Sequence, residues 1–166
     1  HWGLIILFVT HVVGFIGGSY NLGSWVEFFK WVGLGGGIVF LYGVSWAFLR
    51  RIFIPQVRAM STPDDYILLL FLILIAGLGV YQAAIEMIFG IAFLAGPWIA
   101  SIFKLQPDIS GIVAAPLINK LHIIIAFLFF GYFPFTKLVH FASYPFGYIN
   151  RPYVSMRTRR TEREVE

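Results

Sequence analysis

The chain has 166 residues, enough for one domain, but its composition is not that of a soluble protein. Hydrophobic residues make up 59% and charged residues only 12%, against about 25% charged residues in a typical soluble domain. This composition indicates a membrane protein and excludes a disordered chain, a nucleic-acid-binding protein and a secreted disulfide scaffold. The net charge of +4 does not favour nucleic acid, because the basic residues cluster where membrane loops are expected. Cys is absent, which excludes thiolate metal sites and a cysteine nucleophile.

Four apolar stretches are long enough, or nearly so, for membrane-spanning helices of about 20 residues each. In chain order they cover residues 1–17, 31–49, 66–85 and 121–141. The first is short and begins at His instead of Met, so we expect a fragment. Residues 87–117 are apolar but interrupted by prolines, and they predict a loop with a short interfacial helix at 97–104. The predicted fold class is an all-α membrane helical bundle with four transmembrane helices.

Basic residues gather on one side of this alternating topology. Eight Arg fall in the second loop and the C-terminal tail, namely Arg50, Arg51, Arg58, Arg151, Arg157, Arg159, Arg160 and Arg163. The opposite side carries three Lys, namely Lys30, Lys104 and Lys120. Because Lys and Arg are enriched in cytoplasmic loops, we predict a multi-pass protein of the cytoplasmic membrane with a cytoplasmic C-terminus. The five tail Arg exceed what topology requires and predict docking on a cytoplasmic partner.

All four His lie in two of the spans: His1 and His11 in the first, His122 and His140 in the fourth. Ionisable groups at membrane depth are costly and are functional candidates by default. The antiparallel directions of these spans place His1 and His140 near the inner face, and His11 and His122 toward the outer face. Imidazole is a good iron ligand, and axial ligation holds haem. The pattern predicts two stacked haems, each held by one His from each helix.

The spacing of the His residues differs between the two helices. His122 and His140 are separated by 18 residues, which is five helical turns, about 27 Å, and one shared face. His1 and His11 are separated by 10 residues, which is about 15 Å and a rotation of about 80°. Pro134 predicts a kink that absorbs part of the difference. A zinc or di-iron site would require nearby carboxylates or Cys, and Glu86 is on a different span.

Three runs of sequence carry a family resemblance. They are HWGLIILFVTHVVG at 1–14, FLRRIFIPQVRAMSTPDD at 48–65 and KLHIIIAFLFFGYFPFTKLVHFASYPFGYINRPYVSMR at 120–157. In this order they resemble the first haem-ligand helix, the cytoplasmic loop, and the last helix with the tail of the respiratory nitrate reductase gamma subunit, a membrane dihaem cytochrome b. The resemblance implies such a domain over residues 1–149, a basic cytoplasmic tail at 150–166, and five spans in the family, the first missing here.

The resemblance also implies the cofactors and the site residues. Two haem b groups are expected, the inner iron held by His1 with His140 and the outer iron by His11 with His122. The family oxidises quinol near the outer haem, and Lys30 is the nearest match to a lysine linked to quinol binding. Menaquinol or ubiquinol is the expected substrate. Electrons are expected to pass to an iron–sulfur subunit and a molybdenum catalytic subunit, which carry the terminal reaction.

Two alternatives stay open from the sequence. Related cytochromes b serve sulfur-cycle complexes and other molybdoenzyme complexes, so the resemblance does not fix the substrate of the partner. A non-redox membrane anchor or channel, in which the His residues line a polar path, is the competing class. The family commonly has Gly directly before the second ligand, where this chain has Thr10.

Overall fold

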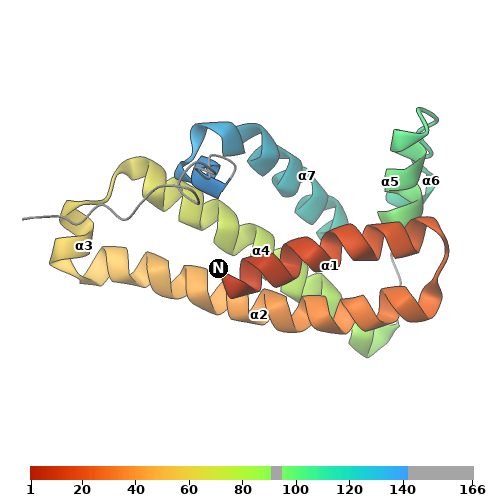
Figure 1. Ribbon diagram of the computed structural model, residues 1–166, viewed down its shortest axis with the longest axis horizontal. Helices are drawn as coiled ribbons and strands as arrows, with labels where there is room; N and C mark the ends of the chain where they lie inside the picture. The colour runs from red at the N-terminus through yellow and green to blue at the C-terminus, as the bar shows by residue number, and fades with distance from the viewer. Residues whose placement is uncertain (91–94, 142–166) are drawn as a thin grey trace, which may run out of the picture.

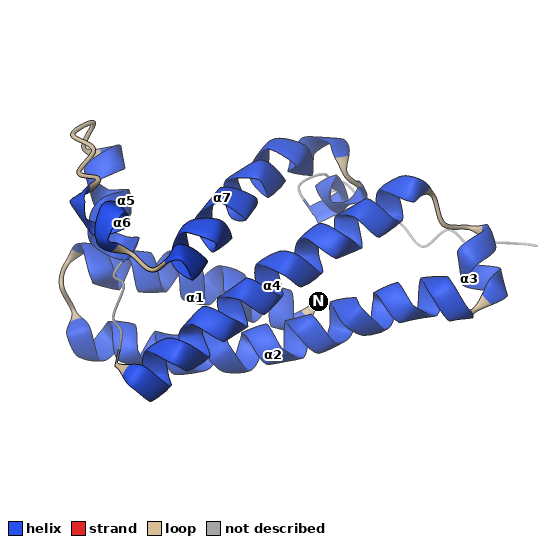
Figure 2. Ribbon diagram, turned by 180° about the vertical axis from the view of Figure 1, so that it is seen from behind, coloured by secondary structure: helices blue, strands red, loops and turns tan. Residues whose placement is uncertain are grey.

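The computed structural model describes residues 1–90 and 95–141, with side chains described up to Val139. Four long helices run along the molecule, namely α1 (Trp2–Ser19), α2 (Gly23–Phe53), α4 (Pro63–Phe89) and α7 (Leu117–Tyr132) (Figure 1). The shorter elements are α3 (Pro55–Ala59), α5 (Ala95–Phe103), α6 (Ser110–Ala114) and the 3₁₀ helices η1 (Phe133–Phe135) and η2 (Lys137–Phe141). All the regular elements in the described part of the chain are helical, as Figure 2 shows.

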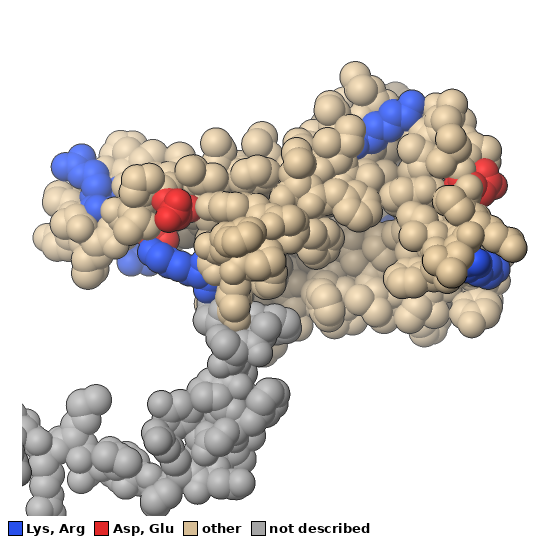
Figure 3. All heavy atoms as spheres, turned by 90° about the horizontal axis from the view of Figure 1, so that it is seen from above, with Lys and Arg blue, Asp and Glu red and all other residues tan. Residues whose placement is uncertain are grey.

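Four described helices are long and apolar enough to cross a membrane, the last of them extended to Phe135 by η1. Large apolar side chains such as Phe8, Trp46, Leu74 and Phe127 are exposed on their outer sides. Water would not favour such a surface, whereas lipid would. On the face drawn in Figure 3, charged side chains lie toward the two ends, and the stretch between them shows no Lys, Arg, Asp or Glu. The predicted all-α membrane bundle is confirmed.

Helices α1 and α2 form a tight antiparallel hairpin. The backbone of Gly3 packs on that of Phe40, where a Cβ on Gly3 would lie 2.6 Å from the Phe40 nitrogen. Farther along α1, Thr10 faces Gly33, at 3.5 Å between the Thr Oγ1 and an ideal Cβ on the glycine. Small residues allow such close approach between membrane helices. Gly33 on the facing helix therefore makes room for the Thr10 side chain.

Helix α4 runs antiparallel to α2, and α7 runs antiparallel to α4. Gly37 of α2 contacts Val80 of α4, and Phe71 of α4 contacts Phe129 of α7 with ring centroids 6.4 Å apart. A small core lies between α2 and α4 and consists of Val44, Leu68, Leu69 and Leu72. Among the long helices, the main packing partners follow the series α1, α2, α4, α7, and α7 makes its main contacts with α4 instead of α1.

Local signals explain where α4 begins and ends. Thr62 and Asp65 form a reciprocal capping box at its start, with Pro63 in the first turn. This arrangement satisfies backbone N–H groups that have no partner within the helix. At the other end Gly90 adopts a left-handed conformation, with φ of 66°, which ends the helix.

The bundle is closed at one end by α5, which packs against α1. The backbones of Gly18 and Gly96 meet there, and Ser19 donates a hydrogen bond from Oγ to the Gly96 carbonyl. Trp98 of α5 contacts Phe127 of α7 with ring centroids 6.4 Å apart. We call this the Lys30 end, and we call the end with the start of α4 the Asp65 end. The predicted short helix at 97–104 is thus confirmed, although its interfacial position stays a prediction.

Two predicted spans differ from the structure. Helix α2 begins at Gly23 instead of residue 31, so Lys30 lies within the helix and not before it. Helix α7 ends at Tyr132, and Thr136 adopts an extended conformation between η1 and η2. Pro134 explains this break, because it has no N–H and its ring clashes with the carbonyl four residues earlier.

The break corrects the predicted geometry of the fourth span. His122 and His140 do not lie on one continuous helix, so the prediction that they share a helical face was wrong. The rise of about 27 Å for 18 helical residues therefore does not apply.

Candidate functional site

His11 lies on α1 and is held by its own helix. The ring Nδ1 is 2.7 Å from the Leu7 carbonyl oxygen. Because a carbonyl only accepts hydrogen bonds, Nδ1 carries the proton, and Nε2 is left with its lone pair. A histidine that binds iron usually has its other nitrogen fixed in this way. The edge of the ring meets Phe15, with centroids 5.7 Å apart.

His122 lies on α7 and packs its ring against Gly79 of α4. A Cβ on Gly79 would lie 3.1 Å from the ring Cε1, so the glycine makes room for the imidazole. Among the described residues, the ring Nδ1 is buried and has no hydrogen-bond partner. Buried polar atoms are normally paired, so this nitrogen has an unused capacity to bind.

The two rings lie at neighbouring levels of the bundle, although they come from helices whose main contacts are with other helices. Thr10 faces Gly33 of α2, and Gly37, one turn farther along α2, contacts Val80 of α4. The residue before Val80 is Gly79, which contacts the His122 ring. Each His offers an imidazole, one with its Nε2 lone pair available and one with a buried, unpartnered nitrogen. Two imidazoles from opposing helices are the donor set of a bis-histidine haem. His11 and His122 therefore fit a haem iron, in line with the predicted pairing, which itself stays a prediction.

His1 and His140 are placed less completely. His1 precedes α1 and lies near the level of Phe40, which is 13 residues, about 20 Å, before the end of α2. His140 belongs to η2, but its side chain is outside the described residues. Phe40 and Leu138 both pack against the small core between α2 and α4. The segments that carry the two His residues thus border one cluster, and their pairing stays a prediction.

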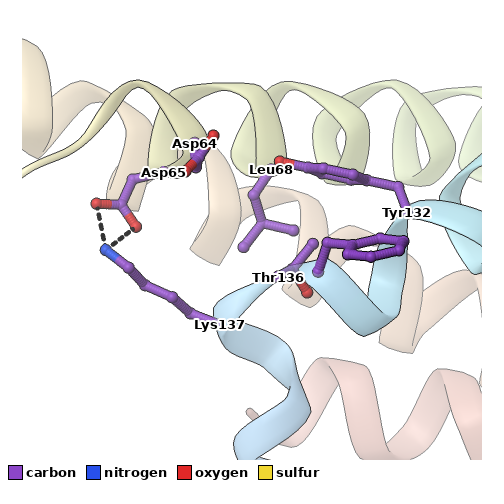
Figure 4. A pocket seen from close by; sticks show the side chains of 7 residues that line it. Asp64, Asp65, Leu68, Tyr132, Thr136 and Lys137 are labelled. Atoms are coloured by element: carbon purple, nitrogen blue, oxygen red, sulfur yellow. Dashed lines mark hydrogen bonds and ion pairs between the residues drawn. The ribbon is translucent and has the colours of Figure 1, made fainter.

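An ion pair with a buried carboxylate holds the segment that leads to His140 (Figure 4). The Lys137 ammonium lies 2.8 Å from the Asp65 carboxylate, and the Asp65 side chain is 7% exposed. A hollow of about 260 Å³ lies beside the pair, between the start of α4 and the turn after α7. Asp65 also caps α4, so one carboxylate joins the start of this helix to η2.

Lys137→Ala is expected to lower the free energy of unfolding by about 1–3 kcal/mol, because it leaves the Asp65 carboxylate buried without its cation. The value lies below that of a fully buried pair because the Lys137 side chain is 64% exposed. Thermal unfolding in detergent measures the change, and Lys137→Arg should retain most of the stability. Lys120→Ala is the matched control, since Lys120 donates only to the Val113 carbonyl. Equal stabilities of the two alanine variants would contradict the prediction.

At the opposite end of the bundle, Lys30 forms an ion pair with Glu86 across α2 and α4. The ammonium lies 3.4 Å from the carboxylate, and the two side chains are 23% and 14% exposed. Lys30 is one helical turn from Gly33, which faces Thr10. The pair therefore lies within about one turn of His11 along the bundle. Sequence analysis set Glu86 aside because it lies on a different span from the His residues. The structure pairs it with Lys30, the predicted quinol ligand.

At this end of α4, a glycine and two polar residues lie on one helix face, an arrangement that sequence analysis missed. We call these three residues the polar row. Gly79, Gln82 and Glu86 follow the spacing i, i+3, i+7, which places them on one helix face. Gly79 contacts the His122 ring, so this face looks toward the candidate haem ligand. The Gln82 Oε1 is buried without a hydrogen-bond partner. The helical spacing of polar residues in an apolar span was the signal that would have revealed this row.

The predicted tail at 150–166, with its Arg residues, lies outside the described residues. Docking of this tail on a partner therefore stays a prediction.

Comparison with known proteins identifies the family of this chain. The family model for the nitrate reductase gamma subunit matches residues 1–159. The chain is 32% identical to the nitrate reductase gamma chain of Bacillus subtilis (strain 168), covering 96% of this chain and 76% of the relative. It is 26% identical to the respiratory nitrate reductase 1 gamma chain of Escherichia coli (strain K12), covering 96% and 75%. It is 30% identical to the nitrate reductase-like protein NarX of Mycobacterium tuberculosis (strain ATCC 25618 / H37Rv), covering 96% of this chain and 26% of the relative. The chain therefore belongs to the nitrate reductase gamma subunit family.

Proposed function

We propose that this membrane subunit of a nitrate reductase oxidises menaquinol or ubiquinol and passes the electrons through two haem b groups to cytoplasmic iron–sulfur and molybdenum subunits. The observation that carries the proposal is the pair of His11 and His122. The two imidazoles lie at neighbouring levels of the bundle on separate helices, and each has a ring nitrogen with unused binding capacity.

Haem supplies an iron that takes up and releases single electrons. His11 and His122 would hold one haem, and His1 and His140 the other. Hydrogen bonding to Leu7 fixes the orientation of the His11 ring. Gly79 leaves room for the His122 ring beside α4. Both roles position an imidazole before any cofactor arrives, which reduces the reorganisation that binding requires.

Quinol would bind at the Lys30 end, close to His11. The Lys30 ammonium would donate a hydrogen bond to a quinol oxygen and stabilise negative charge that develops there. The Arg-rich loop and tail at the other end support an outer position for the Lys30 end, because Lys and Arg are enriched in cytoplasmic loops. Protons would then leave outside while electrons leave inside, and this separation conserves energy.

An absorption spectrum of the reduced, purified protein tests the proposed function. We expect a b-type α band and about two haems per chain when the protein is expressed with an adequate haem supply. We also expect a menaquinol analogue to reduce that haem. A protein that binds no haem under these conditions would instead support the non-redox anchor.

Lys30→Ala is expected to leave both haem spectra intact and to slow haem reduction by quinol at least tenfold, about 1.4 kcal/mol in the barrier. The reason is the loss of the donor to the quinol oxygen. Stopped-flow reduction with a menaquinol analogue is the measurement. Lys104→Ala, on the exposed residue that follows α5, is the matched control. A rate equal to that of this control would remove Lys30 from the quinol site.

A further inference from the structure

We propose that Gln82 and Glu86 form the α4 side of the quinol site, with Gln82 binding a quinol hydroxyl and Glu86 accepting its proton. This inference rests on the proposed function and adds two residues to it. It starts from the polar row on α4, whose first member, Gly79, contacts His122. Gln82 is about one turn beyond this contact, and Glu86 is one turn farther toward the end of the helix.

The buried oxygen of Gln82 indicates that a hydroxyl donor binds there. Gln82 Oε1 is buried and has no hydrogen-bond partner among the described residues. An unsatisfied buried acceptor costs about 1–3 kcal/mol, and an apolar membrane interior offers no water to relieve this cost. A quinol presents a hydroxyl group on an apolar ring. It would therefore satisfy the oxygen and also suit the apolar surroundings of α4.

Glu86 is suited to accept the proton because of its place beside Lys30. Its carboxylate lies 3.4 Å from the Lys30 ammonium, and its side chain is 14% exposed. A quinol oxygen bound by Lys30 would lie close to this carboxylate. Helix α4 ends three residues later, at Phe89, so a proton on Glu86 has a short path to the membrane surface.

The reaction balances with an oxidised haem iron as the one-electron acceptor. Both quinol O–H bonds break and both C–O bonds become carbonyl double bonds, which releases two protons and two electrons. The electrons pass one at a time to ferric haem. The first proton moves to the Glu86 carboxylate and then to water at the membrane surface. The regenerated carboxylate accepts the second proton in the same way.

Two variants separate binding from proton transfer. Glu86→Gln keeps the size and removes the base, so we expect the maximal rate of haem reduction by menaquinol to fall at least tenfold, with KM changed less than about twofold. Gln82→Leu removes the acceptor, so we expect KM to rise at least fivefold with a smaller change in the maximal rate. Reduction by dithionite, which requires no quinol, should be unchanged in both variants.

A measurement on the protein without quinol tests Gln82 independently of turnover. Because Gln82→Leu removes an unsatisfied buried group, its Tm should be no lower than that of the wild type. Adding a menaquinone analogue should raise the Tm of the wild type and should raise that of Gln82→Leu less. A lower Tm with an unchanged KM would show that Gln82 has only a structural role and would overturn its part of the proposal.

Two further carboxylate variants complete the design. Glu27 is exposed on α2, and it is the competing proton acceptor at this end. If haem reduction by menaquinol were slow in Glu27→Gln and as fast as the wild type in Glu86→Gln, the assignment of the proton acceptor to Glu86 would be overturned. Asp108→Asn changes an exposed loop carboxylate and serves as the control, with an expected rate equal to the wild type. A wild-type protein that holds haem but is not reduced by quinol would overturn the proposed function instead.

Discussion

On the proposed haem assignment, His122→Ala is expected to lower the haem content by about one haem per chain, with loss of the haem assigned to His11 and His122. Alanine provides no ligand, and the remaining imidazole cannot hold the iron as a bis-histidine site. His140→Ala should remove the other haem and leave this one in place. Haem quantification, followed by redox titration of each variant, identifies which of the two components is lost.

The matched control for this experiment is Leu121→Ala, on the exposed residue next to His122 in α7. It should retain both haems, since it changes side-chain size without removing a ligand. The informative comparison is with His1→Ala. If His1→Ala and His122→Ala removed the same redox component, the antiparallel assignment of the ligands would be incorrect.

Gly3→Ala is expected to destabilise the protein by about 1–3 kcal/mol or more and to reduce the content of both haems. An added Cβ would lie 2.6 Å from the backbone nitrogen of Phe40, and a helix backbone cannot rotate aside as a side chain can. Helix α1 must therefore shift away from α2, and His1 and His11 move with it. Thermal unfolding and haem quantification on the same detergent preparation measure both effects.

Gly14→Ala provides the control on the same helix. A Cβ at Gly14 meets nothing within 4 Å, and alanine is a better helix former than glycine by about 1 kcal/mol. This variant should be as stable as the wild type or more stable. Equal losses in Gly3→Ala and Gly14→Ala would show that the close contact with Phe40 does not hold α1 in place.

The sequence alone was sufficient for the class of fold and for placing His11 and His122 on two different spans. Runs of apolar residues are a direct consequence of a lipid environment, and Pro97 and its neighbours marked the short helix before α7. The boundaries were less predictable. The first turns of α2 contain Ser24, Glu27 and Lys30, which lower the hydropathy without interrupting the helix. The apolar run therefore began later than the helix.

The contacts that define the site depended on tertiary register, which hydropathy does not encode. Lys30 and Glu86 are 56 residues apart in the chain, and only the antiparallel packing of α2 on α4 brings them together. A kink at Pro134 was predicted, but the helix instead ends at Tyr132 and the chain continues as two 3₁₀ helices. The ion pair between Lys137 and the buried Asp65 carboxylate helps to hold the chain after this break.

The sequential packing of the long helices has a consequence for biogenesis. Each of α2, α4 and α7 finds a main partner among the helices made before it, whereas α1 and α7 stay apart along most of their length. The polypeptide can therefore insert and pair in the order of synthesis without waiting for a cofactor. Iron ligation between the first and last of these helices would be the closing event of maturation. A chain that fails to acquire haem would keep an open seam, which membrane quality-control proteases can recognise.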